Sequence, residues 1–177
     1  MLAVTFAAGC NGGLPGQPSG PPSTGTTEDK PVTPPVVTTD VVSVKVYFAM
    51  KSAQLLAAEV HPLKKDAQLL QKTLELLVAG PKTPGLMPVI PADTKIRSVV
   101  VKDRVAMADF SRELVNKAYG GSTDEILAVA AIVNTLTEFA DVEKVQILVD
   151  GKKVTTLAGH MDVSEPLGRS PDIIRRQ

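Results

Sequence analysis

A proline- and glycine-rich stretch limits how much of this 177-residue chain can fold. Between Asn11 and Asp40, seven prolines and five glycines make up 12 of 30 residues, and half of the others are Ser, Thr or Gln. Such a segment buries too little apolar surface to offset the entropy lost on ordering. We therefore expect a disordered tether at residues 10–41, one folded domain at 42–169, and a flexible tail at 170–177.

A short apolar stretch precedes the only cysteine. Leu2–Ala8 leads into Gly9 and Cys10, and the string Phe-Ala-Ala-Gly-Cys resembles the lipobox of bacterial lipoprotein signal peptides. This resemblance implies that residues 1–9 are a signal peptide and that the Cys10 thiol carries a diacylglycerol. The usual basic residue is missing from Met1–Ala3, which a start codon further upstream would explain. We expect a lipid anchor on the extracytoplasmic face of the cell membrane; the alternative is an ordinary cysteine in a disordered end.

The composition argues against several classes of function. Nineteen Lys and Arg balance nineteen Asp and Glu, so charge gives no reason to expect nucleic acid as a partner. Six aromatic residues offer few stacking platforms, and one cysteine with two distant histidines makes a poor metal site. No apolar run reaches the ~20 residues of a membrane-spanning helix. We therefore expect no metal, no cofactor and no transmembrane helix.

Hydrophobic periodicity predicts an α+β fold. Alternation predicts strands at 42–48, 55–60, 95–101, 104–109, 145–149 and 154–157, the last four forming two hairpins. Helical spacing predicts main helices from Leu69 to Gly80-Pro81 and from Ser122, and a weak short helix at 111–118. Four Pro and Gly residues make 82–93 a loop. We expect a small, mostly antiparallel sheet with two main helices packed on one face.

The helix that begins at Ser122 carries the most detailed predictions. Ser122 and Glu125 have the spacing of a capping box. Its predicted buried stripe consists of Ile126, Val129, Ala130, Val133 and Leu136, and its predicted solvent side of Asn134, Thr137 and Glu138. The Thr135 hydroxyl is expected to bond a carbonyl one turn earlier.

No arrangement of residues predicts an active site. His61 and His160 have no nucleophile at a readable spacing and are expected at the surface or at hinges. Asp109 is expected to cap the 111–118 helix, and Gly120-Gly121 lacks the lysine of a phosphate loop. A hydrolase that uses Asp109 with either histidine remains a weak alternative. We assign no catalytic residue and expect that the chain is not an enzyme.

Seven strings in order resemble the GerMN domain of sporulation and spore germination lipoproteins. They are VYF at 46–48, LELLVAGP at 74–81, VIP at 89–91, VAMADFS at 105–111, IVNTLTE at 132–138, VQILVDG at 145–151 and GHMD at 159–162. The resemblance spans Val44–Arg169. It implies a ring-building-type α+β module that supports envelope assembly outside the cytoplasmic membrane. One copy is visible here, whereas the family's namesake carries two in tandem.

These observations lead to two functional hypotheses. The first is a non-enzymatic, lipid-anchored envelope protein of the sporulation or germination type that acts through protein contacts, including self-association through an open sheet edge or a helix face. The second is a lipoprotein that captures a cell-wall fragment or small solute, with the 82–93 loop as a wall of the pocket.

Overall fold

The computed structural model describes residues 40–116 and 120–176, which belong to one compact unit. The predicted signal peptide, Cys10 and the predicted tether up to residue 39 lie outside the described residues. The strands are β1 (Val41–Met50), β2 (Ala53–Lys64), β3 (Leu86–Met87), β4 (Ile96–Lys102), β5 (Val105–Phe110), β6 (Lys144–Val149), β7 (Lys152–Lys153) and β8 (Leu167–Gly168). The helices are α1 (Leu69–Ala79), α2 (Glu113–Asn116), α3 (Ser122–Leu136) and a 3₁₀ turn, η1 (Pro171–Ile173).

The predicted α+β class is confirmed, but the strands form two sheets where one was expected. One sheet has the order β2-β1-β3 and is antiparallel. The other has the order β4-β5-β6-β7, with β8 paired to β6. In this second sheet β5 and β6 run parallel, because the chain between them crosses over through α2 and α3 as parallel strands require.

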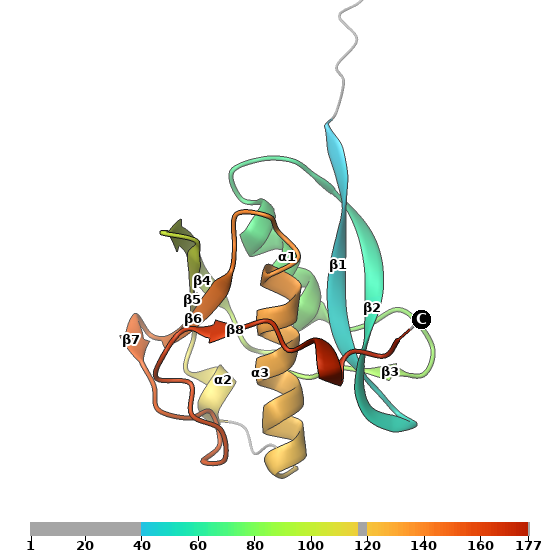
Figure 1. Ribbon diagram of the computed structural model, residues 1–177, viewed down its shortest axis with the longest axis vertical. Helices are drawn as coiled ribbons and strands as arrows, with labels where there is room; N and C mark the ends of the chain where they lie inside the picture. Colours follow the sequence, from blue (N-terminus) through green and yellow to red (C-terminus); the bar gives the residue numbers. More distant parts are fainter. Residues whose placement is uncertain (1–39, 117–119, 177) are drawn as a thin grey trace, which may run out of the picture. The chain divides into compact units, whose positions relative to one another are not determined.

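The two main helices lie between the sheets. Both α1 and α3 contact β1, and on their other side α1 contacts β4 while α3 contacts β6. Figure 1 shows α3 running through the middle of this unit, with β1 and β2 on one side and β4, β5 and β6 on the other. The prediction of helices on one face of one sheet was therefore incomplete, since each helix has apolar surface to bury on two sides.

Local turn chemistry explains several element ends. Gly80 ends α1 with a φ of 84°, as its place before Pro81 predicted. The β4–β5 hairpin is confirmed, and its two turn residues, Asp103 and Arg104, both have positive φ, as a two-residue hairpin turn needs. The Asp150-Gly151 turn also forms. Its returning strand is only Lys152–Lys153, however, so the strand predicted at 154–157 was wrong.

Helix α3 is buried almost all round. Eleven of its fifteen residues are buried, including Glu125, Asn134 and Thr135. The prediction that Ile126 is buried was wrong, since its side chain is 39% exposed, and so was the prediction that Asn134 faces solvent. A helix enclosed by two sheets has no solvent side over most of its length. Its 3.6-residue period therefore does not separate buried residues from exposed ones.

Polar side chains of α3 bind backbone groups of neighbouring segments. The Tyr47 amide of β1 donates a hydrogen bond to Thr135 Oγ1 at 3.2 Å. The Thr135 hydroxyl was predicted to bond a carbonyl within its own helix, whereas this bond joins it to strand β1. Asn134 binds the C-terminal segment twice: Nδ2 donates to the Ser170 carbonyl and Oδ1 accepts from the Ser170 amide. These buried bonds fix β1 and residue 170 to the central helix.

The C-terminal segment is attached to β2, in contrast to the expected flexible tail. Ile174 forms a parallel bridge with Leu56, and the Arg175 amide donates to the Leu56 carbonyl at 2.8 Å. Among the described helices, none has the length and apolar character needed to cross a membrane.

We predict that Thr135→Val destabilises the fold by about 1–3 kcal/mol, because it keeps the shape of the side chain but leaves the buried Tyr47 amide without its acceptor. Urea unfolding followed by circular dichroism measures this change. Thr123→Val is the matched control on the same helix, since the described part of the chain records no hydrogen bond of its hydroxyl. Equal stabilities of the two variants would contradict the assigned bond.

Candidate functional site

Cys10, the one site residue assigned from the sequence, lies outside the described residues. Its lipidation stays a prediction. The described residues offer two kinds of candidate: buried titratable side chains, and a surface groove walled by the proline-rich loop.

Glu125 is a fully buried carboxylate that organises the chain after β7. The capping-box prediction was wrong, because α3 has Gly121 at its N-cap and no side-chain capping bond. The carboxylate instead accepts backbone hydrogen bonds from Leu157, Ala158 and His160 at 2.7–2.9 Å, and His160 Nδ1 lies 2.9 Å from Oε2. Burial acts to raise the pKa of Glu125, but these hydrogen bonds outweigh it and the pKa is lowered.

Glu59 plays the same part for the loop after α1. Its carboxylate accepts hydrogen bonds from the Lys82 and Thr83 amides, the shortest at 2.7 Å. The side chain of His61 is buried beside it, with Nε2 at 2.8 Å from Glu59 Oε1 but not in the direction of a hydrogen bond. The surface or hinge position expected for His61 was therefore wrong. Burial acts to raise the pKa of Glu59, but bonds from Thr83 and Lys82 lower it overall.

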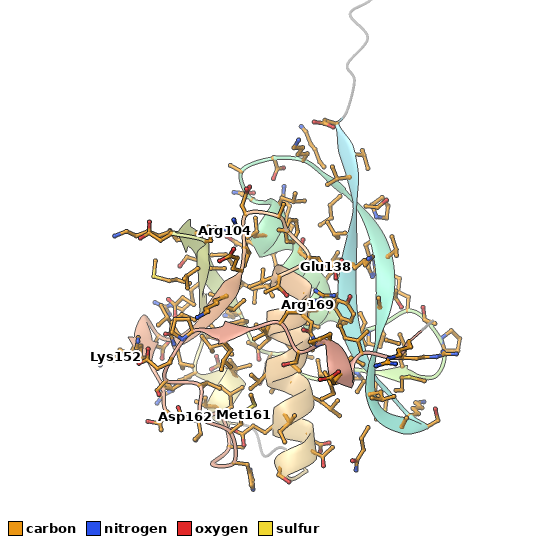
Figure 2. The ribbon with its side chains drawn as sticks, viewed as in Figure 1. Arg104, Glu138, Lys152, Met161, Asp162 and Arg169 are labelled. Carbon is orange, nitrogen blue, oxygen red and sulfur yellow. The ribbon has the colours of Figure 1, made fainter. Side chains whose placement is uncertain are left out.

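A third cluster joins β1, the end of α3 and the C-terminal segment. The Tyr47 hydroxyl donates to Glu138 Oε1 at 2.8 Å and accepts from Arg169 at 2.8 Å. Arg169 also pairs with Glu138 and lies over the Tyr47 ring, 5.5 Å from its centroid. Figure 2 shows Arg169 and Glu138 side by side next to α3. Burial, then the hydrogen bond to Glu138, raises the pKa of Tyr47.

These contacts do not assemble a hydrolytic centre. Asp109 lies inside β5, where Oδ1 accepts from the Gly151 amide at 2.8 Å and Oδ2 lies 3.4 Å from Arg97, so the cap predicted for the 111–118 helix was wrong. His61 and His160 are each engaged with a glutamate of their own. In the described residues, no group of three His, Cys, Asp or Glu is placed to hold a metal. The buried glutamates, Glu59 and Glu125, instead accept hydrogen bonds from loop amides and hold those loops in place.

The proline-rich loop lines a surface groove of about 1060 Å³. Residues 87–93 form one wall, the tip of the β1–β2 hairpin a second, and the first turns of α3 a third. Val89 and Ile90 are buried at the loop, whereas the Met87 side chain is 40% exposed. Lys51, Asp93 and Asp124 are the charged residues in the lining. The Pro and Gly residues at 82–93 predicted the loop. Nothing in the sequence indicated that the β1–β2 hairpin and α3 form the other walls of the groove.

The fold and its buried polar contacts define an α+β module in which titratable side chains hold loops in place. The chain belongs to the Germane family, described as "Sporulation and spore germination", whose model matches residues 45–155. The predicted resemblance to GerMN domains is thereby confirmed.

Matches to two relatives place the chain more closely. It is 32% identical over 122 residues to the spore germination protein GerM of Bacillus subtilis, matching 66% of this chain and 32% of that protein. The first GerMN domain of that GerM superposes with a TM-score of 0.63 at 32% identity, over 72% of this chain and 98% of the domain. A Clostridium perfringens chain described as a candidate lipoprotein superposes with a TM-score of 0.54 at 30% identity, over 76% and 93% of the two chains. The chain thus spans about a third of the curated relative.

We predict that Glu125→Gln lowers the free energy of unfolding by about 3 kcal/mol at pH 7, because a neutral amide cannot accept all the bonds that converge on the carboxylate. The pKa of Glu125 is lower in the folded chain than the ordinary 4.5, so its stabilisation is present above that value and is lost as the pH falls through the folded pKa.

Urea unfolding between pH 3 and pH 7 measures both effects. The variant should show a flatter loss of stability on acidification than the wild type. Glu165→Gln is the control, since that side chain is 81% exposed. Parallel pH profiles for wild type and Glu125→Gln would contradict the role given to this carboxylate.

Proposed function

We propose that this protein is a lipid-anchored, non-enzymatic member of the sporulation and germination family that works through protein contacts in the cell envelope. The observation that carries the proposal is the match of the folded part to nearly the whole of one GerMN domain. Because the folded part corresponds to a single domain of a larger relative, we expect it to act as one binding domain.

The N-terminal region supports attachment to the membrane. A diacylglycerol on Cys10 supplies two acyl chains, and each buried CH₂ contributes about 0.8 kcal/mol, so no basic patch is needed for stable anchoring. The composition of Asn11–Asp40 predicts an average reach of about 30 Å for a flexible chain of thirty residues, and its prolines predict a longer one. The similarity to a chain described as a candidate lipoprotein is consistent with this anchor.

The engagement of the buried and half-buried acids supports a role without catalysis. Glu59, Glu125 and Glu138 all accept hydrogen bonds that hold the chain's own segments. An acid or base in an active site instead needs an open face toward a substrate. We therefore expect the domain to function through its surface, by contacts with other proteins.

A second candidate function is the capture of a cell-wall fragment or small solute in the groove beside residues 87–93. Its volume of about 1060 Å³ lies at the upper end of the range of small-molecule sites. Titration of the domain with soluble muropeptides, followed by the amide shifts of Val89 and Leu127, would test it. Unchanged shifts at millimolar muropeptide would exclude this function.

We predict that Cys10→Ala abolishes incorporation of a clickable fatty acid and releases the protein from the membrane fraction, because the thiol is the only acceptor for the diacylglycerol. Metabolic labelling and gel fluorescence measure the first effect, and fractionation measures the second. Ser19→Ala serves as control. An unlabelled wild type would refute the anchor.

We also predict that deletion of the gene in its own host lowers the count of heat-resistant spores. A wild-type copy should restore the count and a Cys10→Ala copy should not, because the domain would no longer be held at the membrane. Plating after heat treatment measures this. Equal counts with and without the gene would contradict a sporulation role.

A further inference from the structure

Strand β2 lies at the margin of its sheet, and the described residues cover only part of its outer edge. The sheet order β2-β1-β3 leaves one side of β2 without a strand of this sheet. At Leu56 the C-terminal segment occupies that side: Ile174 bridges Leu56, and the Arg175 amide donates to the Leu56 carbonyl. The chain therefore already uses this edge as a template for strand pairing, next to the stretch that follows.

The backbone direction of the following residues can be derived from this bond. In an antiparallel pair, backbone groups of alternate residues point toward the partner and away from it. Because the Leu56 carbonyl points away from β1, the N–H and C=O groups of Ala58 and Val60 do so too. The β1 side agrees, since Tyr47, the partner of Ala58, donates its amide to Thr135 on the far side. Pro62 has no N–H and ends the series of donors.

The side chains around this edge are apolar and basic. A groove of about 520 Å³ lies here, lined by Lys45, Tyr47, Ala57, Ala58, Val60, Ile174 and Arg175. The Val60 side chain is 59% exposed. The lining holds two cations and no acid. Lys45 is paired with Glu138 at 3.1 Å, whereas the described residues record no acidic partner for Arg175.

We propose that the Ala58–Pro62 edge of β2 binds an extended, acidic segment of a protein partner by strand addition. Backbone groups of Ala58 and Val60 pair with the segment, an apolar side chain of the segment packs on Val60 and Ile174, and a carboxylate pairs with Arg175. This inference rests on the proposed function, for which it supplies a contact surface and the chemistry of the partner.

Charge selects this occupant over a second copy of the chain. Lys45 stands opposite Val60, and Arg175 lies at Leu56. Two β2 edges paired antiparallel through Ala58 and Val60 would bring Arg175 of one copy toward Lys45 of the other. Glu138 already offsets the charge of Lys45, so the preference rests on Arg175, which an acidic segment meets favourably and the basic edge of a second copy does not.

The test is an amide-shift titration of the ¹⁵N-labelled full chain carrying Cys10→Ala. The probe is the peptide acetyl-Asp-Glu-Val-Thr-Val-Thr-Val-Glu-Asp-amide, and the control peptide has lysine in place of every acid. We expect shifts concentrated at Ala58, Val60 and Arg175 with the acidic peptide only. Arg175→Glu should weaken its affinity at least tenfold, and Lys152→Glu, an exposed cation on β7, should leave the affinity unchanged.

Three outcomes would overturn the proposal. The first is the absence of shifts at about 2 mM peptide, a concentration that reveals even millimolar affinity. The second is an equal response to the basic peptide. The third is a concentration-dependent shift of the same amides without peptide, which would assign the edge to a second copy. None of these results depends on acyl labelling or on spore counts, so this inference can fail while the proposed function stands.

Discussion

The enclosure of α3 between two sheets is the constraint on which the rest of this structure depends. A helix buried on nearly every side must satisfy its polar side chains within the protein, and unpaired buried polar groups are costly. Glu125, Asn134 and Thr135 meet this requirement by binding backbone groups of other segments. The helix therefore fixes β1, the chain near residue 158 and the C-terminal segment at once, and these become parts of a single framework.

This arrangement engages the buried carboxylates with the chain's own backbone. Burial acts to raise the pKa values of Glu59 and Glu125, but hydrogen bonds from backbone amides outweigh it, so both pKa values are lowered and the carboxylates stay charged. The loops that they fix in turn shape the exterior. Glu59 holds the start of the proline-rich loop that lines the larger groove, and the Arg169 cluster leads the C-terminal segment to the edge of β2. Inner contacts thus determine the shape of these outer surfaces.

The sequence predicted local structure well and long-range contacts poorly. The two main helices, the exit at Gly80 and the Asp150-Gly151 turn follow from periodicity and turn chemistry, which act over a few residues, whereas the β4–β5 turn lies one residue beyond the predicted Lys102-Asp103. The partners of Glu125, Asn134 and Tyr47 lie 32, 36 and 91 residues away. A spacing rule could not find them, and for Glu125 the capping-box spacing pointed to the wrong role. The parallel pairing of β5 with β6 was missed for the same reason.

The amino-acid sequence by itself determined the α+β class and the family, because periodicity and ordered strings are properties of the linear chain. Only the tertiary structure decided that the strands split into two sheets, that α3 is buried over most of its length, and that the tail closes part of the β2 edge. Each of these depends on which distant surfaces meet. Burial and hydrogen bonding between segments determine which surfaces meet, and neither leaves a local pattern in the sequence.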